Sequence, residues 1–518
     1  MTRFVTAAEA VQAIRDDMTV AVGGFNGFGT PDELILALRD RFLETGAPRR
    51  LTLMKSVSVG DRGERGVNRI ALDGLIRRVI SSHVGLEPAM ARLIEENKCL
   101  AYMVPLGTMT ELYRAAAAGR SGVLTHVGLE TFVDPRLEGG RANDLTRAEG
   151  AGISEILEVA GEKRLFYPTI PVDVCLIRGT CADRKGNIVL SREAMHGEQL
   201  GAAAAAHNSG GTVIVQVERI SEEDFDPRIV KLHHFMVDYV VVGKPENHVQ
   251  GYDVPDYRPE VSGEVRKPLD AIAPMALNAR KICGRRAALE LRPDSLINLG
   301  IGVPEAVAAV AAEEGIADRF TLSIESGVLG GVPLSGLGLG GTTNPEAIYK
   351  MPDILNIYDG GGLDMAVLGM AEADESGNVN VSKFGGRITG PGGFINIAQN
   401  TKTVIFTGTF TAGGLKEEIR DGTLRILQEG RAKKLRKQVE QITFSGSYAR
   451  RAGKRVLLIT ERAVFRLTER GLELIEIAPG VDLEQDVLGQ MEFRPVISEN
   501  LKEMDPRIFR EEKMGLKV

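Results

Sequence analysis

Met18-Thr-Val-Ala-Val22 leads directly into Gly23-Gly-Phe-Asn-Gly-Phe-Gly-Thr-Pro31, and a helical pattern follows from Asp32 through Leu38. The order is strand, glycine loop, proline and helix. Proline suits the first turn of a helix, because an N–H group at that position would have no partner within the helix. The remaining free N–H groups of the turn form an anion-binding site. The stretch therefore predicts a β–α unit with a ligand loop between its strand and its helix.

The same order returns in the second half of the chain. Ser295-Leu-Ile-Asn-Leu299 leads into Gly300-Ile-Gly-Val-Pro304, and a helical pattern follows from Glu305 through Ala312. A second echo pairs Ala182-Asp-Arg-Lys-Gly-Asn187 with Ala373-Asp-Glu-Ser-Gly-Asn378, and each is typical of a tight hairpin turn. We therefore expect an α/β protein with two similar open α/β domains that arose by internal duplication.

The length of 518 residues exceeds what one hydrophobic core normally serves. We predict an N-terminal domain over residues 1–250, a linker over 251–270, and a C-terminal domain over 271–518 that carries the catalytic glutamate described below. Near the predicted linker, glycines and prolines interrupt the regular spacing of apolar residues that a helix or strand would show. Neither glycine loop has the spacing Gly-x-Gly-x-x-Gly, which argues against a nicotinamide cofactor.

Bulk properties exclude several classes of protein. The formal charge of -7 is mild for this length, so we expect no nucleic-acid partner. No run approaches the roughly 18 uninterrupted apolar residues of a membrane span, and the N-terminus lacks the apolar core of a signal peptide. The 4 cysteines are too few and too scattered for a disulfide framework or a zinc site. We expect a soluble, cytoplasmic protein with no bound metal and no membrane partner.

A carboxylate stands where a buried strand breaks into glycine. Phe320-Thr-Leu-Ser-Ile324 is followed by Glu325-Ser-Gly-Val-Leu-Gly-Gly-Val-Pro333. A carboxylate at the mouth of a strand, among residues that expose backbone N–H groups, is placed for nucleophilic attack. The alternative is a solvated turn residue. We take Glu325 as the candidate catalytic residue.

Further glycine loops cluster in the same half as Glu325. Such loops can aim N–H groups at a developing oxyanion, although each alone is also consistent with a simple tight turn. Gly392 and Gly393, in Gly390-Pro-Gly-Gly-Phe394, are our candidate oxyanion donors. All 7 histidines precede residue 249, and the sequence contains no Ser-His-Asp arrangement with a nucleophile elbow. The basic run Arg431-Ala-Lys-Lys-Leu-Arg-Lys437 is typical of a solvated helix face, with a phosphate-rich ligand as the alternative.

In this order the motifs resemble those of the family I coenzyme A transferases. The closest resemblance is to the fused, single-chain type exemplified by propionate and acetate CoA-transferases, and the chain is also similar to 3-oxoacid CoA-transferases. The motifs that carry the resemblance are Gly23-Gly-Phe with Pro31, Asn298-Leu-Gly-Ile-Gly-Val-Pro304, Ser323-Ile-Glu-Ser-Gly327, Gly390-Pro-Gly-Gly-Phe394, Thr460-Glu-Arg-Ala-Val-Phe-Arg-Leu467 and Ile477-Ala-Pro-Gly480.

The resemblance implies a ping-pong enzyme that moves CoA from a short-chain acyl-CoA to a free carboxylate such as acetate or propionate. Glu325 would carry a glutamyl-CoA thioester between the two half-reactions. CoA would be a substrate, and no metal or dissociable cofactor would be required. The partners would be acyl-CoA and short-chain carboxylates, and the assembly a homodimer or homotetramer. The candidate substrate-binding residues are Gly24, Gly27, Gly107, Gly300 and Gly302.

Two positions depart from the family pattern. Leu106 stands where many relatives have a glutamine, and Glu130 stands where relatives usually have glycine. Both bear on the substrate rather than on the class of reaction. The other functions considered are an acyl-CoA hydrolase, in which water resolves the thioester, and a catalytically inactive CoA-binding protein. Fold alone does not separate these functions.

Overall fold

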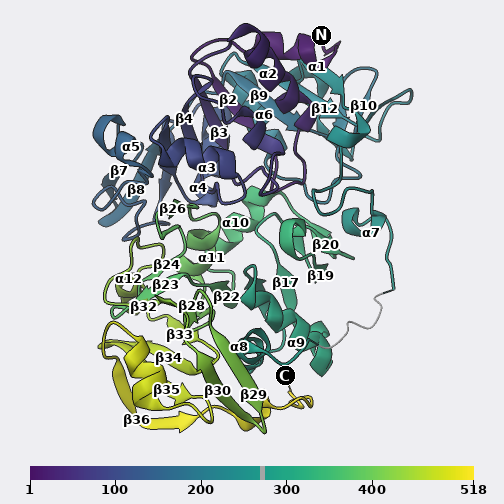
Figure 1. The fold of residues 1–518 in the computed structure, drawn as a ribbon. Coiled ribbons are helices and arrows are strands. Elements are labelled where there is room, and N and C mark those ends of the chain that lie inside the picture. The colour runs from purple at the N-terminus through teal and green to yellow at the C-terminus, as the bar shows by residue number, and fades with distance from the viewer. Residues whose placement is uncertain (269–274, 518) are drawn as a thin grey trace. The chain divides into compact units, whose positions relative to one another are not determined.

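The computed structural model describes residues 1–268 and 275–517 (Figure 1). The chain divides into two compact units, which we call unit 1 and unit 2. Unit 1 comprises Met1–Lys267, Ile324–Asn356 and Gly386–Asn396, and unit 2 comprises Pro268–Ser323, Ile357–Gly385 and Ile397–Val518.

These units are not the contiguous halves expected from the sequence. The segment that carries Glu325 belongs to unit 1, not to a domain formed by residues 271–518. Ile388 and Ile395 show why, because both are buried in the hydrophobic core of unit 1. Within the predicted linker, Pro259–Ser262 forms the short helix α7, and residues 269–270 lie outside the described residues.

Unit 1 is built on an eight-stranded sheet in which every pair of neighbours is parallel. Its strands are short apolar runs, and β2 has all of its residues buried, as expected for a sheet that is covered on both faces. In spatial order the strands are β1 (Arg3–Phe4), β15 (Tyr239–Val242), β12 (Thr212–Val217), β9 (Val174–Arg178), β2 (Thr19–Val22), β3 (Leu51–Lys55), β4 (Ile76–Ser81) and β5 (Leu100–Met103).

Helices connect these parallel strands, and α6 packs against β9 and β12 while α4 packs against α6. The helices of unit 1 that precede α7 are α1 (Ala7–Ala10), α2 (Asp32–Thr45), α3 (Pro88–Glu95), α4 (Leu106–Ala117), α5 (Asp144–Glu149) and α6 (Gln199–Asn208). Smaller strands of unit 1 are β6 (Gly122–Thr125), β7 (Glu155–Val159), β8 (Glu162–Pro168), β10 (Cys181–Asp183), β11 (Ile188–Val189), β13 (Arg219–Ser221), β14 (Val230–Leu232), β18 (Val328–Leu329), β19 (Val332–Pro333), β20 (Thr342–Thr343), β21 (Ala347–Ile348) and β26 (Arg387–Ile388).

Unit 2 contains a mixed sheet that is parallel from β17 to β33, antiparallel from β33 to β35, and parallel again between β35 and β36. In spatial order its strands are β17 (Thr321–Ser323), β16 (Leu296–Leu299), β22 (Met365–Gly369), β27 (Thr403–Thr407), β33 (Arg455–Ile459), β34 (Ala463–Thr468), β35 (Gly471–Ile477) and β36 (Val496–Glu503).

Further strands of unit 2 are β23 (Glu372–Asp374), β24 (Val379–Asn380), β25 (Lys383–Phe384), β28 (Thr411–Ala412), β29 (Lys416–Arg420), β30 (Thr423–Gln428), β31 (Ala432–Lys433) and β32 (Leu435–Arg436). The remaining helices are α8 (Ala279–Ala288), α9 (Ala306–Glu314), α10 (Met351–Asp359), α11 (Phe394–Asn400) and α12 (Gly446–Arg451). The residue sets of the two units divide within α10 and α11.

The strand order reveals the internal duplication. In unit 1, β2 lies between β3 and β9, and β12 and β15 follow β9. In unit 2, β16 lies between β17 and β22, and β27 and β33 follow β22. Each half therefore repeats one arrangement, in which β3 corresponds to β17 and β9 corresponds to β22. The helix that precedes the following strand is α6 in the first half, before β12, and α11 in the second half, before β27.

The two predicted hairpins confirm this correspondence in detail. β10 pairs antiparallel with β11, and β23 pairs antiparallel with β24. In the first turn the Asn187 amide donates to Asp183 Oδ2 over 2.7 Å, and in the second the Asn378 amide donates to Asp374 Oδ2 over 3.0 Å. An aspartate thus caps both turns in the same way.

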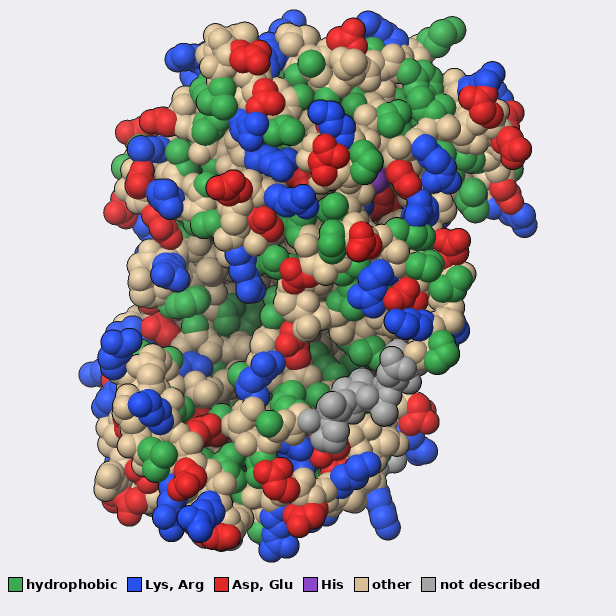
Figure 2. Space-filling view, turned by 45° about the vertical axis from the view of Figure 1, so that its right-hand side comes forward, with side chains coloured by type: hydrophobic (Ala, Val, Ile, Leu, Met, Phe, Trp, Pro, Cys, Tyr) green, Lys and Arg blue, Asp and Glu red, His purple; other side chains and the backbone are tan. Residues whose placement is uncertain are grey.

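Charged side chains of both signs are interspersed over the face that Figure 2 shows, with apolar side chains scattered between them. This mixture is typical of a protein surface without a broad region of one charge. Across residues 1–268 and 275–517, no helix is both long and apolar enough to cross a membrane.

Candidate active site

Three neighbouring parallel strands of unit 1 end at the same edge of their sheet. β3 ends at Lys55, β4 at Ser81 and β5 at Met103. The following loops are tied together, because the Ser82 N–H donates to the Ser56 carbonyl over 3.2 Å. Ligands of open parallel sheets bind outside the carboxyl ends of the strands, so a site is expected at this edge.

The loop that precedes α11 is bonded to this edge. The Val84 N–H donates to the Thr389 carbonyl over 2.8 Å, and the Gly392 N–H donates to the Ser82 carbonyl over 2.9 Å. At the start of α4, the Leu106 N–H donates to the Gly392 carbonyl over 3.1 Å. These backbone bonds fix the predicted glycine loop against the strand ends of unit 1.

A tight turn presents Glu325. The Gly327 N–H donates to the Ile324 carbonyl over 2.9 Å, and the Ile324 N–H donates to the Val328 carbonyl over 2.9 Å. Gly327 has a φ of 107°, which strains any residue with a side chain, and the Tyr349 carbonyl fills the space where a Cβ would stand. The turn therefore requires glycine and holds the glutamate at a fixed place.

The carboxylate of Glu325 lies directly against Gly393. A methyl group added at Gly393 would overlap Oε2 of the glutamate. Glu325 is partly buried and has no ion-pair or hydrogen-bond partner among the described residues. Burial raises the pKa of Glu325 from 4.5 to about 7. A carboxylate that has lost hydration and gained no partner is suited to nucleophilic attack.

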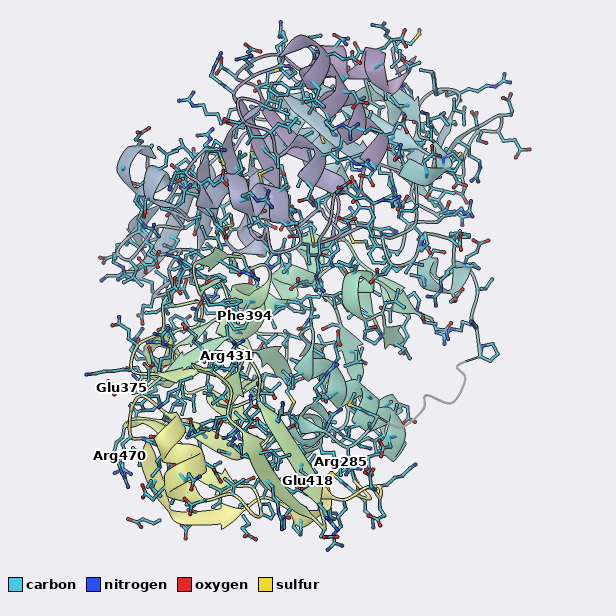
Figure 3. All side chains as sticks on the ribbon, in the orientation of Figure 1. Arg285, Glu375, Phe394, Glu418, Arg431 and Arg470 are labelled. Carbon is cyan, nitrogen blue, oxygen red and sulfur yellow. The ribbon has the colours of Figure 1, made fainter. Side chains whose placement is uncertain are left out.

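The two predicted oxyanion donors differ in what they can offer. The N–H of Gly392 is already bonded to the Ser82 carbonyl, so our expectation that it faces an oxyanion is wrong. The N–H of Gly393 precedes the first residue of α11, Phe394, which Figure 3 labels, and has no partner among the described residues. Unbonded N–H groups at a helix start are natural anion donors, so Gly393 remains the candidate.

A buried ion pair that no sequence motif marked lies beneath this site. Lys55 Nζ lies 3.0 Å from Glu87 Oε1, and both side chains are 0% exposed. Lys55 also donates to the Ser81 hydroxyl over 2.9 Å and to the His83 carbonyl over 2.7 Å. The pair therefore braces the loop after β4, which in turn receives Gly392. A lysine at the end of an apolar strand was the available signal.

His83 is a second residue near the site that no sequence motif marked. A methyl group on Gly392 would lie 3.9 Å from its ring carbon Cδ2. Its Nδ1 lies 2.8 Å from the Ser58 hydroxyl. Burial, together with the positive charges of Lys55 and Arg62, lowers the pKa of His83 to about 4. The imidazole beside the glycine loop is thus neutral at physiological pH.

The five predicted substrate-binding glycines fall in different places. Gly107 is close to the site, since its N–H donates to Oδ1 of Asn396 on α11 over 3.0 Å. A Cβ on Gly24 would lie 2.9 Å from the Thr30 hydroxyl, and one on Gly27 would lie 2.5 Å from the Tyr252 ring. Packing within unit 1 therefore accounts for the need for glycine at these two positions.

Gly300 and Gly302 lie in unit 2, on either side of Ile301. Ile301 lines a cavity of about 870 Å³ that is formed entirely by residues of unit 2. Its other lining residues include the apolar Met370, Ala371 and Phe384. The second glycine loop thus contributes Ile301, which stands between Gly300 and Gly302, to the lining of this cavity.

The same cavity changes the interpretation of the basic run. Residues 431–437, which begin at the labelled Arg431 in Figure 3, form the short strands β31 and β32, so the predicted helix face is wrong. Lys433, Lys434 and Arg436 line the cavity. Burial lowers the pKa of Lys434, whose side chain is 8% exposed. Glu372 and Glu492 line it as well, and both pair with Arg436, over 2.7 Å and 3.7 Å, so Lys433 and Lys434 are the lining cations left to attract an anionic ligand.

The two departures from the family pattern have structural consequences. Leu106 is 0% exposed, and its backbone N–H is bonded to Gly392, so neither its side chain nor its N–H is open to a ligand. Glu130 has a φ of 63°, in the left-handed region that glycine enters most easily. A glycine would adopt this backbone conformation without strain, whereas glutamate adopts it at a cost.

Among the described residues, no group of three or more His, Cys, Asp or Glu side chains is arranged to hold a metal ion. Cys99, Cys175, Cys181 and Cys283 are all buried free thiols. Burial raises the pKa of Cys99 to about 12, and it raises the thiol pKa values of the other three as well.

Comparisons with known proteins agree with the motifs. A family model described as Coenzyme A transferase matches residues 4–243. The caffeate CoA-transferase of Acetobacterium woodii is 46% identical over 100% of this chain and 99% of its own length. The acetate CoA-transferase YdiF of Escherichia coli (strain K12) is 41% identical over 99% of this chain and 96% of its own length.

The fold agrees as well. A crystal structure of the acyl-CoA transferase YdiF from Escherichia coli O157:H7, a thioester complex with CoA, matches with a TM-score of 0.93 and 41% identity. The match covers 100% of this chain and 98% of that one. Similarity of this degree extends over both duplicated halves. The chain belongs to the coenzyme A transferase family.

Proposed function

We propose that this CoA-transferase moves CoA from a short-chain acyl-CoA to a free carboxylate such as acetate or propionate, with Glu325 as the covalent carrier. The observation that carries the proposal is the unpaired carboxylate of Glu325 lying against Gly393. A relative at 41% identity forms a thioester complex with CoA, and another is named an acetate CoA-transferase. The first name supports a thioester intermediate with CoA, and the second supports a small carboxylic acid as substrate.

The first half-reaction would begin with attack of a Glu325 oxygen on the acyl carbonyl. The C–S bond breaks, and CoA leaves as a thiolate, which gives a mixed anhydride. The thiolate then attacks the glutamyl carbonyl, the anhydride C–O bond breaks, and the first acid departs as its carboxylate. The product of this half-reaction is a glutamyl-CoA thioester.

The second half-reaction would run the same steps in reverse with the acceptor carboxylate. Each attack creates a tetrahedral oxyanion, and the open N–H of Gly393 supports it as a donor. The cycle calls on no metal or dissociable cofactor, because Glu325 itself carries the intermediate. Water must be kept from the thioester, and the partial burial of Glu325 favours this.

CoA also needs a place for its phosphates, and we assign the cavity of unit 2 to this task. The supporting features are its volume of about 870 Å³ and two lysines, Lys433 and Lys434, whereas the third lining cation, Arg436, is paired with Glu372 and Glu492 of the same lining. The Lys433 ammonium donates to the Gly489 carbonyl over 2.8 Å, so its head is held in place. We further propose a cytoplasmic homodimer or homotetramer, a setting in which the four buried thiols stay reduced.

Chromatography of the CoA species tests the proposal. Propionyl-CoA is incubated with the enzyme in the presence and absence of acetate. We expect acetyl-CoA to form in step with propionyl-CoA loss, only when acetate is present and without release of free CoA.

The matched variants are Glu325→Gln and Glu346→Gln, since Glu346 is an exposed glutamate of unit 1 with the same side chain. Transfer should fall at least about 1,000-fold in Glu325→Gln and stay unchanged in Glu346→Gln. Acetate-independent release of free CoA would instead assign a hydrolase, and strong transfer by Glu325→Gln would contradict the role of that residue.

A further inference from the structure

The oxyanion of the proposed reaction has one open backbone donor in the glycine loop before α11. The N–H of Gly393 has no partner among the described residues, whereas the N–H of Gly392 is bonded to the Ser82 carbonyl. Leu106 at the start of α4 adds no donor, because its N–H is bonded to the Gly392 carbonyl and its side chain is apolar. Oxyanion sites usually combine more than one donor, so a second donor is expected beside this loop.

The imidazole of His83 lies beside the same loop. A methyl group on Gly392 would lie 3.9 Å from its ring carbon Cδ2. The nitrogen Nε2 is bonded to Cδ2 within the ring, so the ring edge that is near Gly392 also carries Nε2. The next residue of the loop, Gly393, lies against Oε2 of Glu325. Consecutive glycines of one loop therefore adjoin the imidazole and the nucleophile.

The chain around His83 holds the ring at a fixed place. A Cβ added at Gly85 would lie 2.7 Å from Cε1 of His83 and 2.9 Å from Nε2, so a side chain at that position would displace the imidazole. The Val84 N–H donates to the Thr389 carbonyl over 2.8 Å, which joins this segment to the glycine loop. Lys55 donates to the His83 carbonyl over 2.7 Å. The position of the ring beside the loop is thus set by the backbone.

Two hydrogen bonds determine which nitrogen of His83 carries the proton. The Gly85 N–H, which can only donate, lies 3.2 Å from Nδ1. The Ser58 hydroxyl lies 2.8 Å from the same nitrogen, and it accepts from the Leu86 N–H over 3.4 Å, which leaves its own hydrogen for Nδ1. Nδ1 is therefore an acceptor, and in the neutral ring the proton is on Nε2.

The Nε2–H group of His83 is an unused donor. Among the described residues, Nε2 has no hydrogen-bond or ion-pair partner. Burial, together with the charges of Lys55 and Arg62, lowers the pKa of His83 to about 4, so the ring is neutral wherever the Glu325 carboxylate is ionised. A charged imidazolium would attract that carboxylate and weaken it as a nucleophile, whereas a neutral ring leaves it reactive.

We propose, on the basis of the function proposed above, that His83 donates its Nε2–H to the oxyanion that forms when Glu325 attacks an acyl-CoA, together with the N–H of Gly393. The thioester carbonyl oxygen gains negative charge as the Glu325 oxygen bonds to its carbon, and the two donors share that charge. The C–S bond then breaks, the carbonyl forms again, and CoA leaves as a thiolate. His83 keeps its proton throughout.

Two substitutions of His83 separate a donor role from an anchoring role. The side-chain amide of glutamine can place an N–H near the position of Nε2, whereas the shorter asparagine reaches only the position of Nδ1. His83→Gln therefore keeps the proposed donor, and His83→Asn keeps only the contacts with Ser58 and Gly85. A donor role predicts that glutamine is the better replacement, and an anchoring role predicts asparagine.

Transfer of CoA from propionyl-CoA to acetate measures the difference. We expect kcat to fall at least about 100-fold in His83→Asn and no more than about tenfold in His83→Gln, because removing one oxyanion donor slows the chemical step. The KM for each substrate should stay within about threefold of the wild-type value, since the donor acts in the transition state. Without acetate, formation of the CoA adduct on Glu325 should slow in the same order.

His248→Asn is the matched control. His248 is another imidazole of unit 1 whose pKa is lowered by burial, and its Nδ1 lies 3.2 Å from the Gln216 amide. Its exchange should leave kcat within about threefold of the wild-type value. If circular dichroism shows that His83→Asn fails to fold, His83→Phe takes its place, because phenylalanine keeps a ring and offers no donor.

The outcomes distinguish the donor role from the proposed function. Transfer by His83→Asn that is as fast as transfer by His83→Gln would overturn the donor role and leave the transferase standing. An equal loss in His248→Asn would also overturn it, because general destabilisation would then explain the effect. If the wild-type enzyme transfers CoA to no acid, the proposed function fails, and the donor role fails with it.

Discussion

Oε2 of Glu325 occupies the space beside Cα of Gly393 that a side chain would otherwise fill. The glutamate comes from the turn after β17, and the glycine comes from the loop before α11. The same half of the chain thus supplies both the nucleophile and the glycine against which it lies. Every part of the proposed chemistry depends on this close approach.

Gly393→Ala should therefore remove activity without unfolding the protein. The added methyl group would displace the Glu325 carboxylate from its attacking position, and we expect transfer to fall about 100-fold or more. The carboxylate can swing away, so circular dichroism and the unfolding temperature should change little. Gly152→Ala is the control, because its added Cβ would meet nothing closer than 3.5 Å. Full activity in Gly393→Ala would show that the approach is not used.

The rate of the first half-reaction should depend on pH through Glu325. Only the ionised carboxylate attacks, and burial raises the pKa of this group to about 7. Below pH 7, kcat/KM for the acyl-CoA should therefore fall about tenfold per pH unit, and above pH 8 it should level off. A profile that stays flat between pH 5.5 and 8 would contradict the raised pKa.

Stability should follow the opposite trend. The pKa of Glu325 in the folded protein lies above its ordinary value of 4.5, so the folded state binds the proton more tightly. The stabilising contribution of this group is fully present below about pH 4.5 and is lost as the pH rises through 7. Above pH 7 the ionised Glu325 carboxylate is therefore an active nucleophile, and in the same pH range it lowers the free energy of unfolding most.

Lys433 allows the assignment of the unit 2 cavity to be tested. Lys433→Ala should raise the KM for acyl-CoA about three- to tenfold, and the effect should shrink at high salt, because screening weakens charge attraction. The KM for acetate should stay the same. Lys437→Ala is matched to it, since Lys437 belongs to the same basic run but does not line the cavity. Equal effects of both variants would indicate a general loss of charge.

The Lys55–Glu87 pair should matter for stability more than for chemistry. Lys55→Met would leave the Glu87 carboxylate buried and unpaired, at an expected cost of about 3–5 kcal/mol in the free energy of unfolding. The double variant Lys55→Met with Glu87→Leu should recover much of that loss. Denaturant unfolding of the single and double variants measures the difference. A double variant as unstable as Lys55→Met would show that packing, not charge, is what the pair provides.

The duplication was predictable from sequence, because the turn residues Asp183 and Asp374 are read directly from two matching stretches. Glu325 and Gly393 were predictable for a related reason, since glycine-rich loops mark places where backbone approaches a reactive group. Long-range pairing was not predictable. Lys55 and Glu87 meet only because β3 and β4 are neighbours in a parallel sheet, and no local pattern encodes that.

The basic run was misinterpreted for a physical reason. Seven residues with five basic side chains are compatible with a helix as well as with a strand, and charge alone cannot separate the two. In the structure β31 pairs with β28 and β32 pairs with β23, so the alternating pattern is the real one. Pairing with strands elsewhere in the chain therefore determines that these residues form strands, although their local sequence is equally compatible with a helix.

Glu325 is proposed to carry CoA as a thioester, and peptide mass spectrometry detects that intermediate. The enzyme is incubated with acetyl-CoA or propionyl-CoA without an acceptor, digested under conditions that preserve thioesters, and searched for a CoA-sized adduct. The account predicts the adduct on the peptide that contains Glu325, its disappearance when acetate is added, and its absence in Glu325→Gln. An adduct on another residue, or turnover of acyl-CoA with no adduct at all, would contradict it.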